Sequence, residues 1–191
     1  KTVMTDEEYS IVVSMIFQTA TTNRTASKCY ANLYIKLMEL CEEMKDKFNN
    51  NLDKYLDGFN RDFVTVDADK DYEQFCLINL QNEKRRGISK FFTELFNVGL
   101  VENSRFEEIL LDLCDLLFTS CKEENKKTAC EEIAENLFIL LTNMIDYNKI
   151  DSKDIMQKLI NIKDLKKSEY NPSFSPKVKF KLMDIFDKYN N

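Results

Sequence analysis

Residues 80–100 read LQNEKRRGISKFFTELFNVGL, and this stretch decides the fold of the chain. Its apolar residues recur at the spacing i, i+3, i+4, i+7 and i+8, which places them on one side of an α-helix. They are Ile88, Phe91, Phe92, Leu95 and Phe96. Gly99 follows the last of them, where a helix end favours a residue without Cβ. The stretch therefore predicts a helix that begins with basic residues, ends in aromatic core and stops at Gly99.

The composition of the whole chain favours a helical protein. Its 191 residues suit one domain, and 43% of them are hydrophobic, which is enough for a sizeable core. Only three glycines and two prolines interrupt the sequence, which argues against a β-sandwich. The lack of histidine excludes a Ser-His-Asp triad, a Cys-His dyad and the usual zinc hydrolase sites. A net charge of −6 disfavours nonspecific binding of nucleic acid by the whole surface, although local basic patches are compatible with it.

The six cysteines indicate reduced thiols in an intracellular protein. None of them forms a CxxC pair, and a metal cluster is not expected without histidine. Cys41 and Cys114 fall on apolar stripes, as buried free thiols do. No apolar run approaches the length that spans a membrane. We therefore expect a cytoplasmic protein with no membrane association and no bound metal or other cofactor.

Helical periodicity continues on both sides of the quoted stretch. Thr5 and Glu8 form a capping-box pattern ahead of the first helix. The expected helices cover about residues 5–20, 26–45, 47–63, 70–98, 103–117, 130–145, 151–160 and 177–189. Segments 64–69 and 167–176 are expected to be loops, and the charged run 120–127 is either a connection or a helix start.

Helices joined by short connections pack as antiparallel pairs. One pair cannot bury its apolar stripes alone, whereas stacked pairs can. We therefore predict an all-α fold, a HEAT-like α-solenoid of about four to five antiparallel helix pairs, formed as a single domain by residues 1–191. No strict period is visible, so the repeats are expected to be degenerate, and a compact irregular bundle is the alternative.

Four stretches resemble the MIF4G domain, the middle domain of the eukaryotic translation-initiation scaffold 4G. Residues 84–100 resemble its KRR, G, KF, ELF and GL signature, and residues 16–20 with 30–31 resemble its IFEKA and YA pattern. Residues 140–143 resemble its LLTT helix, and residues 175–184 its final S-x-R-x-R-F-x-L-x-D helix. The stretches follow the order of the family from about Glu8 to Asp187. Arg86, Thr93 and the lysines at 177 and 179 depart from the family pattern, and lysine lacks the bidentate geometry of arginine.

The resemblance implies a scaffold and not an enzyme, and the lack of glycine-rich phosphate loops agrees with this. Domains of the family bind a DEAD-box RNA helicase of the eIF4A type, hold its two lobes with the ends of the helical stack, and in many cases contact RNA. The implied partners are therefore this helicase, RNA and other initiation factors, and we expect the chain to be monomeric. One alternative is a related MIF4G module in mRNA decay, splicing or poly(A)-dependent regulation. Another is a helical RNA- or protein-interaction domain with no helicase partner.

The last expected helix supplies the candidate helicase contacts. Phe180 and Met183 lie opposite its inward apolar stripe, beside Lys177 and Asp184. A phenylalanine in this place is either a filler at the edge of the core or an exposed anchor for a partner. The acidic residues of the 130–145 helix, which are Glu131, Glu132 and Glu135, are either a solvated face or a match for a basic helicase lobe. The candidate helicase-binding residues are Phe180, Lys177, Met183, Asp184, Glu131 and Glu135.

Two basic clusters are the candidate RNA contacts. One is formed by Lys84, Arg85 and Arg86, and the other by Lys163, Lys166 and Lys167. Each cluster either binds RNA phosphates or is a solvated helix end with salt bridges to acidic neighbours, and we favour the second interpretation. The aromatic stripe of residues 91–96 is expected to be core, because it shares one helix face with aliphatic residues.

Overall fold

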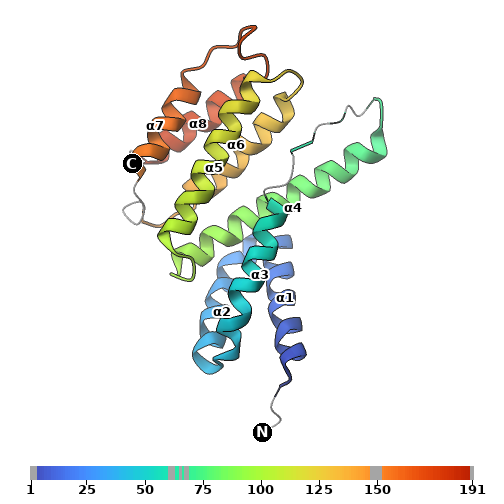
Figure 1. Ribbon diagram of the computed structural model, residues 1–191, viewed down its shortest axis with the longest axis vertical. Coiled ribbons are helices and arrows are strands. Elements are labelled where there is room, and N and C mark those ends of the chain that lie inside the picture. The colour runs from blue at the N-terminus through green and yellow to red at the C-terminus, as the bar shows by residue number, and fades with distance from the viewer. Residues whose placement is uncertain (1–3, 60–62, 65, 67–68, 147–151, 190–191) are drawn as a thin grey trace.

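The computed structural model describes residues 4–59, 63–64, 66, 69–146 and 152–189. Every regular element among these residues is helical, and the part of the chain described contains no strand (Figure 1). In chain order the elements are α1 (Asp6–Thr22), the 3-10 helix η1 (Arg24–Ala26), α2 (Ser27–Leu40), α3 (Glu43–Phe59), α4 (Tyr72–Asn97), α5 (Asn103–Lys122), α6 (Lys127–Thr142), α7 (Ser152–Lys163) and α8 (Pro176–Tyr189). The predicted all-α class is confirmed.

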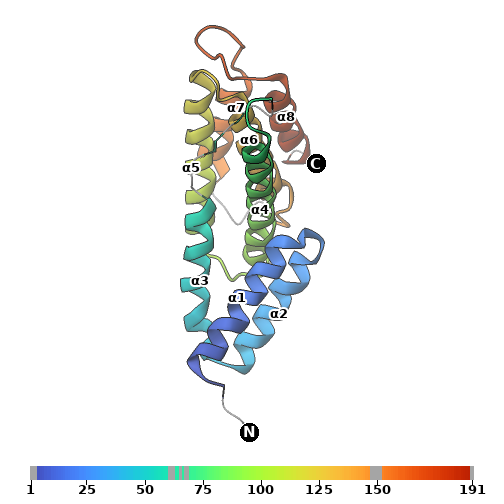
Figure 2. The same ribbon diagram turned by 90° about the vertical axis from the view of Figure 1, so that its right-hand side faces the viewer.

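The long helix α4 connects two groups of helices. α1, α2 and α3 pack against α4, and α6 also packs against it (Figure 1). α5 then packs on α6 and α7, and α8 packs on α6 and α7. Figure 2 shows from the side that α1 and α2 lie at the end of the molecule opposite to α7 and α8. The contacts of α2 with α4, of α4 with α6 and of α6 with α8 arrange the even-numbered helices in one continuous row.

Both ends of α4 are set by local interactions. Asp71 accepts a hydrogen bond from the backbone N–H of Gln74 at 2.9 Å and so caps the first turn. At the other end Gly99 has a φ of 80°, its N–H donates to the Phe96 carbonyl, and the N–H of Leu100 donates to the Leu95 carbonyl. This is the Schellman arrangement, which favours glycine because the left-handed conformation strains a residue that has a Cβ. The predicted helix end at Gly99 is confirmed.

The apolar stripe of α4 forms the centre of the core. Its five residues from Ile88 to Phe96 are each at most 5% exposed, which confirms the core interpretation of residues 91–96. On one side Phe91 meets the ring of Phe17 edge to face at 5.2 Å, and on the other Phe96 stacks on Phe106 at 4.1 Å. These contacts with α1 and α5 anchor α4 in both groups of helices.

Helix α1 crosses α4 at Gly87. A Cβ placed on Gly87 would lie 1.7 Å from the carbonyl oxygen of Thr21, which is closer than any real contact. A side chain here would therefore push α1 away from α4, so glycine at this position has a packing reason.

Several boundaries differ from the sequence prediction. The expected helices 26–45 and 47–63 are separated earlier, at Cys41, whose φ of −149° is extended. This break lets α3 turn back, so that the hydroxyl of Tyr34 donates to the carbonyl of Met44 at 2.9 Å. α5 continues beyond its expected end at residue 117 to Lys122, so the first residues of the charged run 120–127 are helical. α6 begins at Lys127 and not at Cys130. The capping box of Thr5 and Glu8 is confirmed, with hydrogen bonds in both directions.

Candidate functional site

A row of polar side chains joins α4 to α6. The guanidinium of Arg86 donates to both carboxylate oxygens of Glu132, at 2.8 and 2.5 Å, and to Glu83 at 2.6 Å. The next hydrogen bond along the row runs from the Ser89 hydroxyl to the Asn136 side-chain oxygen at 2.8 Å. Because the charged hydrogen bonds to Glu132 stabilise the cation, the pKa of Arg86 is raised above its ordinary value. The row is thus an internal link between helices.

The same row continues to the ends of both helices. The ammonium of Lys90 donates to Glu94 and to Asn143, each at 2.6 Å, and the amide of Asn97 donates to the Asn143 carbonyl at 2.9 Å. The hydroxyl of Thr93 is fully buried and donates to the Ser89 carbonyl at 3.0 Å. Satisfied buried polar groups of this kind set the register of two packed helices.

The first basic cluster separates into three environments. Lys84 is exposed, and Arg86 is engaged with Glu132. Arg85 is only 6% exposed, lies over the ring of Phe63 with its guanidinium carbon 4.6 Å from the ring centre, and donates to Asn82 at 2.8 Å. Burial lowers the pKa of Arg85, with a partial opposing effect of Glu132. These positions argue against phosphate binding by Arg85 and Arg86, and leave Lys84 available.

The second basic cluster is also divided. Lys163 is half-buried, with its ammonium 5.2 Å from the ring centre of Phe186 and 3.6 Å from Asp164. Lys166 and Lys167 follow the end of α7 and are exposed. Of this cluster, therefore, only these two lysines present their charge fully to solvent.

The acidic residues of α6 hold neighbouring helices in place. Glu132 is only 6% exposed, so the interpretation of a solvated acidic face is wrong for this residue. Glu131 accepts a hydrogen bond from the Ser175 hydroxyl at 2.9 Å and forms an ion pair with Lys177 at 3.3 Å. A further ion pair joins Glu135 to Lys181 at 2.8 Å. Because these carboxylates already have partners inside the chain, they are not a free acidic patch for a helicase lobe.

Helix α8 has one buried face, which packs on the rest of the chain, and one exposed face. Ser175 caps it by accepting from the Val178 N–H at 3.3 Å, and Pro176 occupies the first helical position, where its missing N–H costs nothing. Its inward stripe is fully buried, and consists of Val178, Leu182 and Ile185. On the other face Phe180 is 62% exposed and Met183 is 41% exposed, with Asp184 exposed beside them. The predicted division of this helix into two faces is confirmed, while binding of a partner to it stays a prediction.

Sequence reasoning missed Glu132 and Asn136 as the partners of the basic cluster. The available signal was their spacing of four residues on α6, which matches Arg86 and Ser89 three residues apart on α4. Only the contact between the two helices shows that these faces meet.

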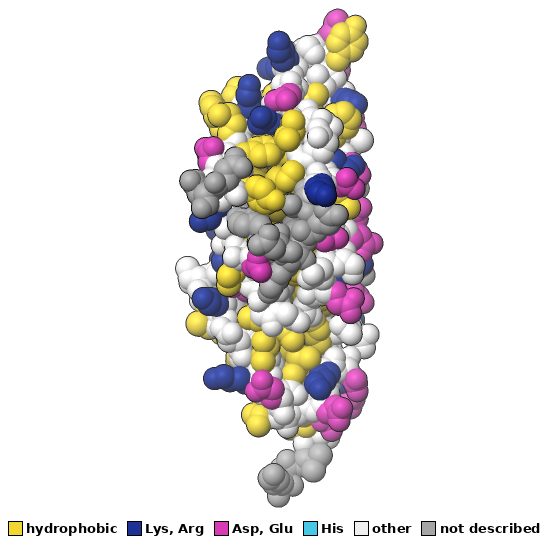
Figure 3. Space-filling view, turned by 90° about the vertical axis from the view of Figure 1, so that its left-hand side faces the viewer, with side chains coloured by type: hydrophobic (Ala, Val, Ile, Leu, Met, Phe, Trp, Pro, Cys, Tyr) yellow, Lys and Arg dark blue, Asp and Glu magenta, His cyan; other side chains and the backbone are white. Residues whose placement is uncertain are grey.

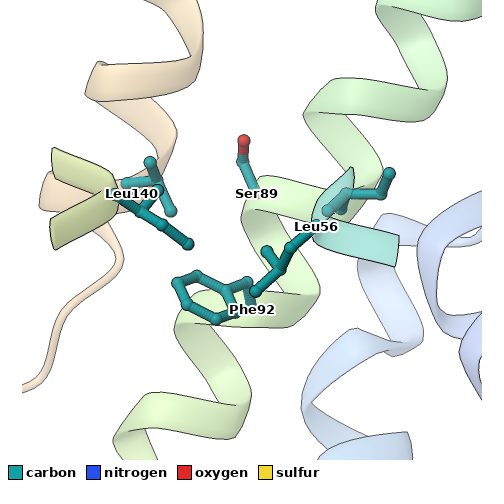
Figure 4. Close-up of a pocket in the computed structure, with 6 residues that line it drawn as sticks. Leu56, Ser89, Phe92 and Leu140 are labelled. Carbon is teal, nitrogen blue, oxygen red and sulfur yellow. The ribbon is translucent and has the colours of Figure 1, made fainter. Parts of the chain in front are cut away.

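A narrow cleft and three buried cysteines lie in the interior of the molecule. The cleft in Figure 4, which Leu56, Ser89, Phe92 and Leu140 line, has no room for a water molecule and is a packing junction of α3, α4 and α6. No group of three potential metal ligands is present among the residues described. All six cysteines are free, and burial raises the pKa of Cys114 to about 12, which makes a poor nucleophile.

The surface and the helix lengths add two further observations. On the face that carries α2 and α7, hydrophobic side chains gather in an upper and a lower patch, and charges of both signs surround them (Figure 3). Among the side chains drawn in colour on this face neither sign dominates, so it does not present an extended basic surface. None of the described helices combines the length and the apolar character needed to cross a bilayer.

Comparison with known proteins finds no match for this chain among protein-family models, curated proteins or solved structures. The resemblance to the MIF4G domain therefore stays a prediction from the sequence motifs.

Proposed function

We propose that this chain is a MIF4G-like scaffold domain that binds a DEAD-box RNA helicase of the eIF4A type in the cytoplasm. The observation that carries the proposal is the outer face of α8, where Phe180 is 62% exposed on a helix whose other side is fully buried. Aromatic side chains, phenylalanine included, are enriched at the centres of protein interfaces, where a few residues supply most of the binding energy.

The support beneath Phe180 suits a scaffold. The Ser175 cap and the ion pairs of Lys177 and Lys181 to α6 fix the direction of α8 before a partner arrives. A partner that binds to such a preorganised face loses less binding energy to ordering. In the proposal Met183 and Asp184 extend the contact, whereas Glu131 and Glu135 act indirectly by positioning α8.

The proposed architecture is a short HEAT-like solenoid. The continuous row of α2, α4, α6 and α8 is what stacked helix pairs produce, although α4 is much longer than its neighbours. A stack that is rigid on the timescale of binding can hold the two mobile lobes of a helicase in a productive orientation and so shift their population towards the closed state.

The test is binding of the purified chain to an eIF4A-type helicase, with ATPase stimulation as the second measurement. We expect Phe180→Ala to weaken binding by about thirtyfold, which corresponds to a hot spot of about 2 kcal/mol. The matched control is Tyr170→Ala, which removes an aromatic ring that is 76% exposed outside α8. Equal binding by wild type and Phe180→Ala, with the fold intact, would refute the α8 contact.

An RNA- or protein-interaction domain without a helicase partner is the second candidate. Exposed Lys166 and Lys167 favour it, because neither forms an ion pair with a described residue and such lysines can contact phosphates. If both bind single-stranded RNA, replacing them with alanine lowers the slope of log affinity against log salt by about 1.4. RNA binding with this salt dependence, but no effect on helicase ATPase activity, would favour this candidate over the first.

A further inference from the structure

A surface hollow of about 510 Å³ lies where the end of α1 meets the first half of α4. α1 contributes Gln18 and Thr22, α3 contributes Tyr55, and α4 contributes Leu80 and Lys84. A volume of this order is typical of sites that accept a ligand or several side chains of a peptide. Unlike the junction in Figure 4, this hollow has room for an occupant.

Exposed apolar side chains extend from the hollow along both helices. On α1, Ile11 and Met15 are 58% and 61% exposed and share a helix face with Gln18 and Thr22, because the spacing is four, three and four residues. On α4, Leu77 and Leu80 are 49% and 69% exposed. From Ile11 to Thr22 this face of α1 is roughly 16 Å long, and its two apolar residues occupy the part away from the hollow. The hollow together with the exposed apolar residues of α1 and α4 is therefore longer than a small-molecule site, and it suits an amphipathic helix that crosses it.

The charge of the hollow is positive. The carboxylate of Glu83 is bound by Arg24 at 3.0 Å and by Arg86 at 2.6 Å, so its charge is already balanced. The ammonium of Lys84 is exposed and makes no ion pair with a described residue. The whole chain carries a net charge of −6, so the positive charge of Lys84 in the hollow differs from the rest of the surface. It favours an occupant that places an acidic group beside this lysine.

We propose that this hollow and its two apolar stripes are the docking site for an acidic amphipathic helix of a partner protein. Its apolar face lies on Ile11, Met15, Leu77 and Leu80, and a carboxylate in its central turn binds Lys84. RNA is disfavoured as occupant, because the described lining of the hollow offers a single cation without an ion pair, Lys84, whereas a nucleic-acid backbone needs several phosphate contacts. The site belongs to α1 and α4 and is distinct from the α8 face, so it does not depend on the proposed helicase contact.

The experiment uses the full chain as bait for a displayed library of random 16-residue peptides. We expect the selected peptides to be rich in aspartate and glutamate, with apolar residues at helical spacing. One selected peptide with a fluorescent label is then titrated with variants by anisotropy. Leu80→Asn and Lys84→Glu should each weaken its binding by about tenfold or more.

Matched controls separate the hollow from general effects. Leu40→Asn changes another exposed leucine, and Lys36→Glu makes the same charge change on α2, so both should bind as wild type. Since Leu80 and Lys84 are exposed, circular dichroism should show an unchanged fold in all four variants.

Three outcomes would overturn the proposal. The first is a selection that yields basic peptides or no peptides, and the second is binding that Leu80→Asn leaves unchanged. The third is self-association of the wild-type chain at micromolar concentration that Leu80→Asn abolishes, because it would show that a second copy of this chain covers the hollow.

Discussion

Replacement of Gly87 by alanine tests the crossing of α1 and α4 on which the first half of the fold depends. In an unconstrained helix this change stabilises by about 1 kcal/mol, because alanine is the better helix former. Here the new Cβ would lie 1.7 Å from the Thr21 carbonyl oxygen and 2.7 Å from its carbon. Both are backbone atoms, so no rotation of a side chain can relieve the clash.

The magnitude follows from the distance that the helices must move. Real Cβ contacts are essentially never shorter than 3.0 Å, so α1 and α4 must separate by at least about 1.3 Å. A gap of this size removes much of the dispersion attraction across the contact, including that between Phe17 and Phe91. Overpacking costs about 1–3 kcal/mol or more, and the lost contacts add to it. After the gain in helix propensity we expect Gly87→Ala to be less stable by about 2 kcal/mol or more.

Urea denaturation followed by far-ultraviolet circular dichroism measures this change. For a chain of this size 2 kcal/mol corresponds to a decrease in Tm of about 4–8 °C. Lys84→Ala is the matched control, because it lies one turn away on the exposed side of α4 and should change stability by less than about 0.5 kcal/mol. If Gly87→Ala were as stable as wild type, α1 would not cross α4 at this point and the reasoning would fail.

Three further predictions concern the cap, the buried ion pair and alkaline pH. Gly99→Ala should cost about 1 kcal/mol in chemical denaturation, because φ is 80° there while no atom lies within 4 Å of the new Cβ. Arg86→Met should cost about 3 kcal/mol in chemical denaturation, because it leaves the buried carboxylate of Glu132 without its cation; a cost below about 0.5 kcal/mol would contradict this account. Burial raises the pKa of the Tyr34 phenol above its ordinary value of 10.0 and that of Cys114 from 9.0 to about 12, so the folded chain holds both protons more tightly than the unfolded chain. Their contribution to the free energy of unfolding is complete below pH 9, and it decreases as the pH rises above 9 for Cys114 and above 10 for Tyr34. In thermal melts Tyr34→Phe should therefore make the decrease in stability above pH 10 less steep. At pH 7 the same variant should cost about 1 kcal/mol, because the hydrogen bond to the Met44 carbonyl is lost.

The sequence predicted those features that depend on local spacing. The apolar stripe of α4, its end at Gly99 and the capping box of Thr5 follow from residues within a few positions of each other. The place of Phe180 on the face opposite the buried stripe of α8 was also predictable, because a helix turns by about 100° per residue. The sequence left open whether the ring at this place is exposed or fills the edge of the core, and the structure shows that it is exposed.

Distant contacts decided what the sequence could not. Lys84, Arg85 and Arg86 look alike in sequence, yet one is exposed, one is buried against Phe63 and one binds Glu132, which lies 46 residues away. The break at Cys41 likewise follows from the fit of α3 beneath Tyr34. Helical periodicity alone therefore determined that this chain is all-α and which side of each helix is apolar. Tertiary structure decided which charges are free to meet a partner, because burial and pairing depend on helices that arrive from elsewhere in the chain.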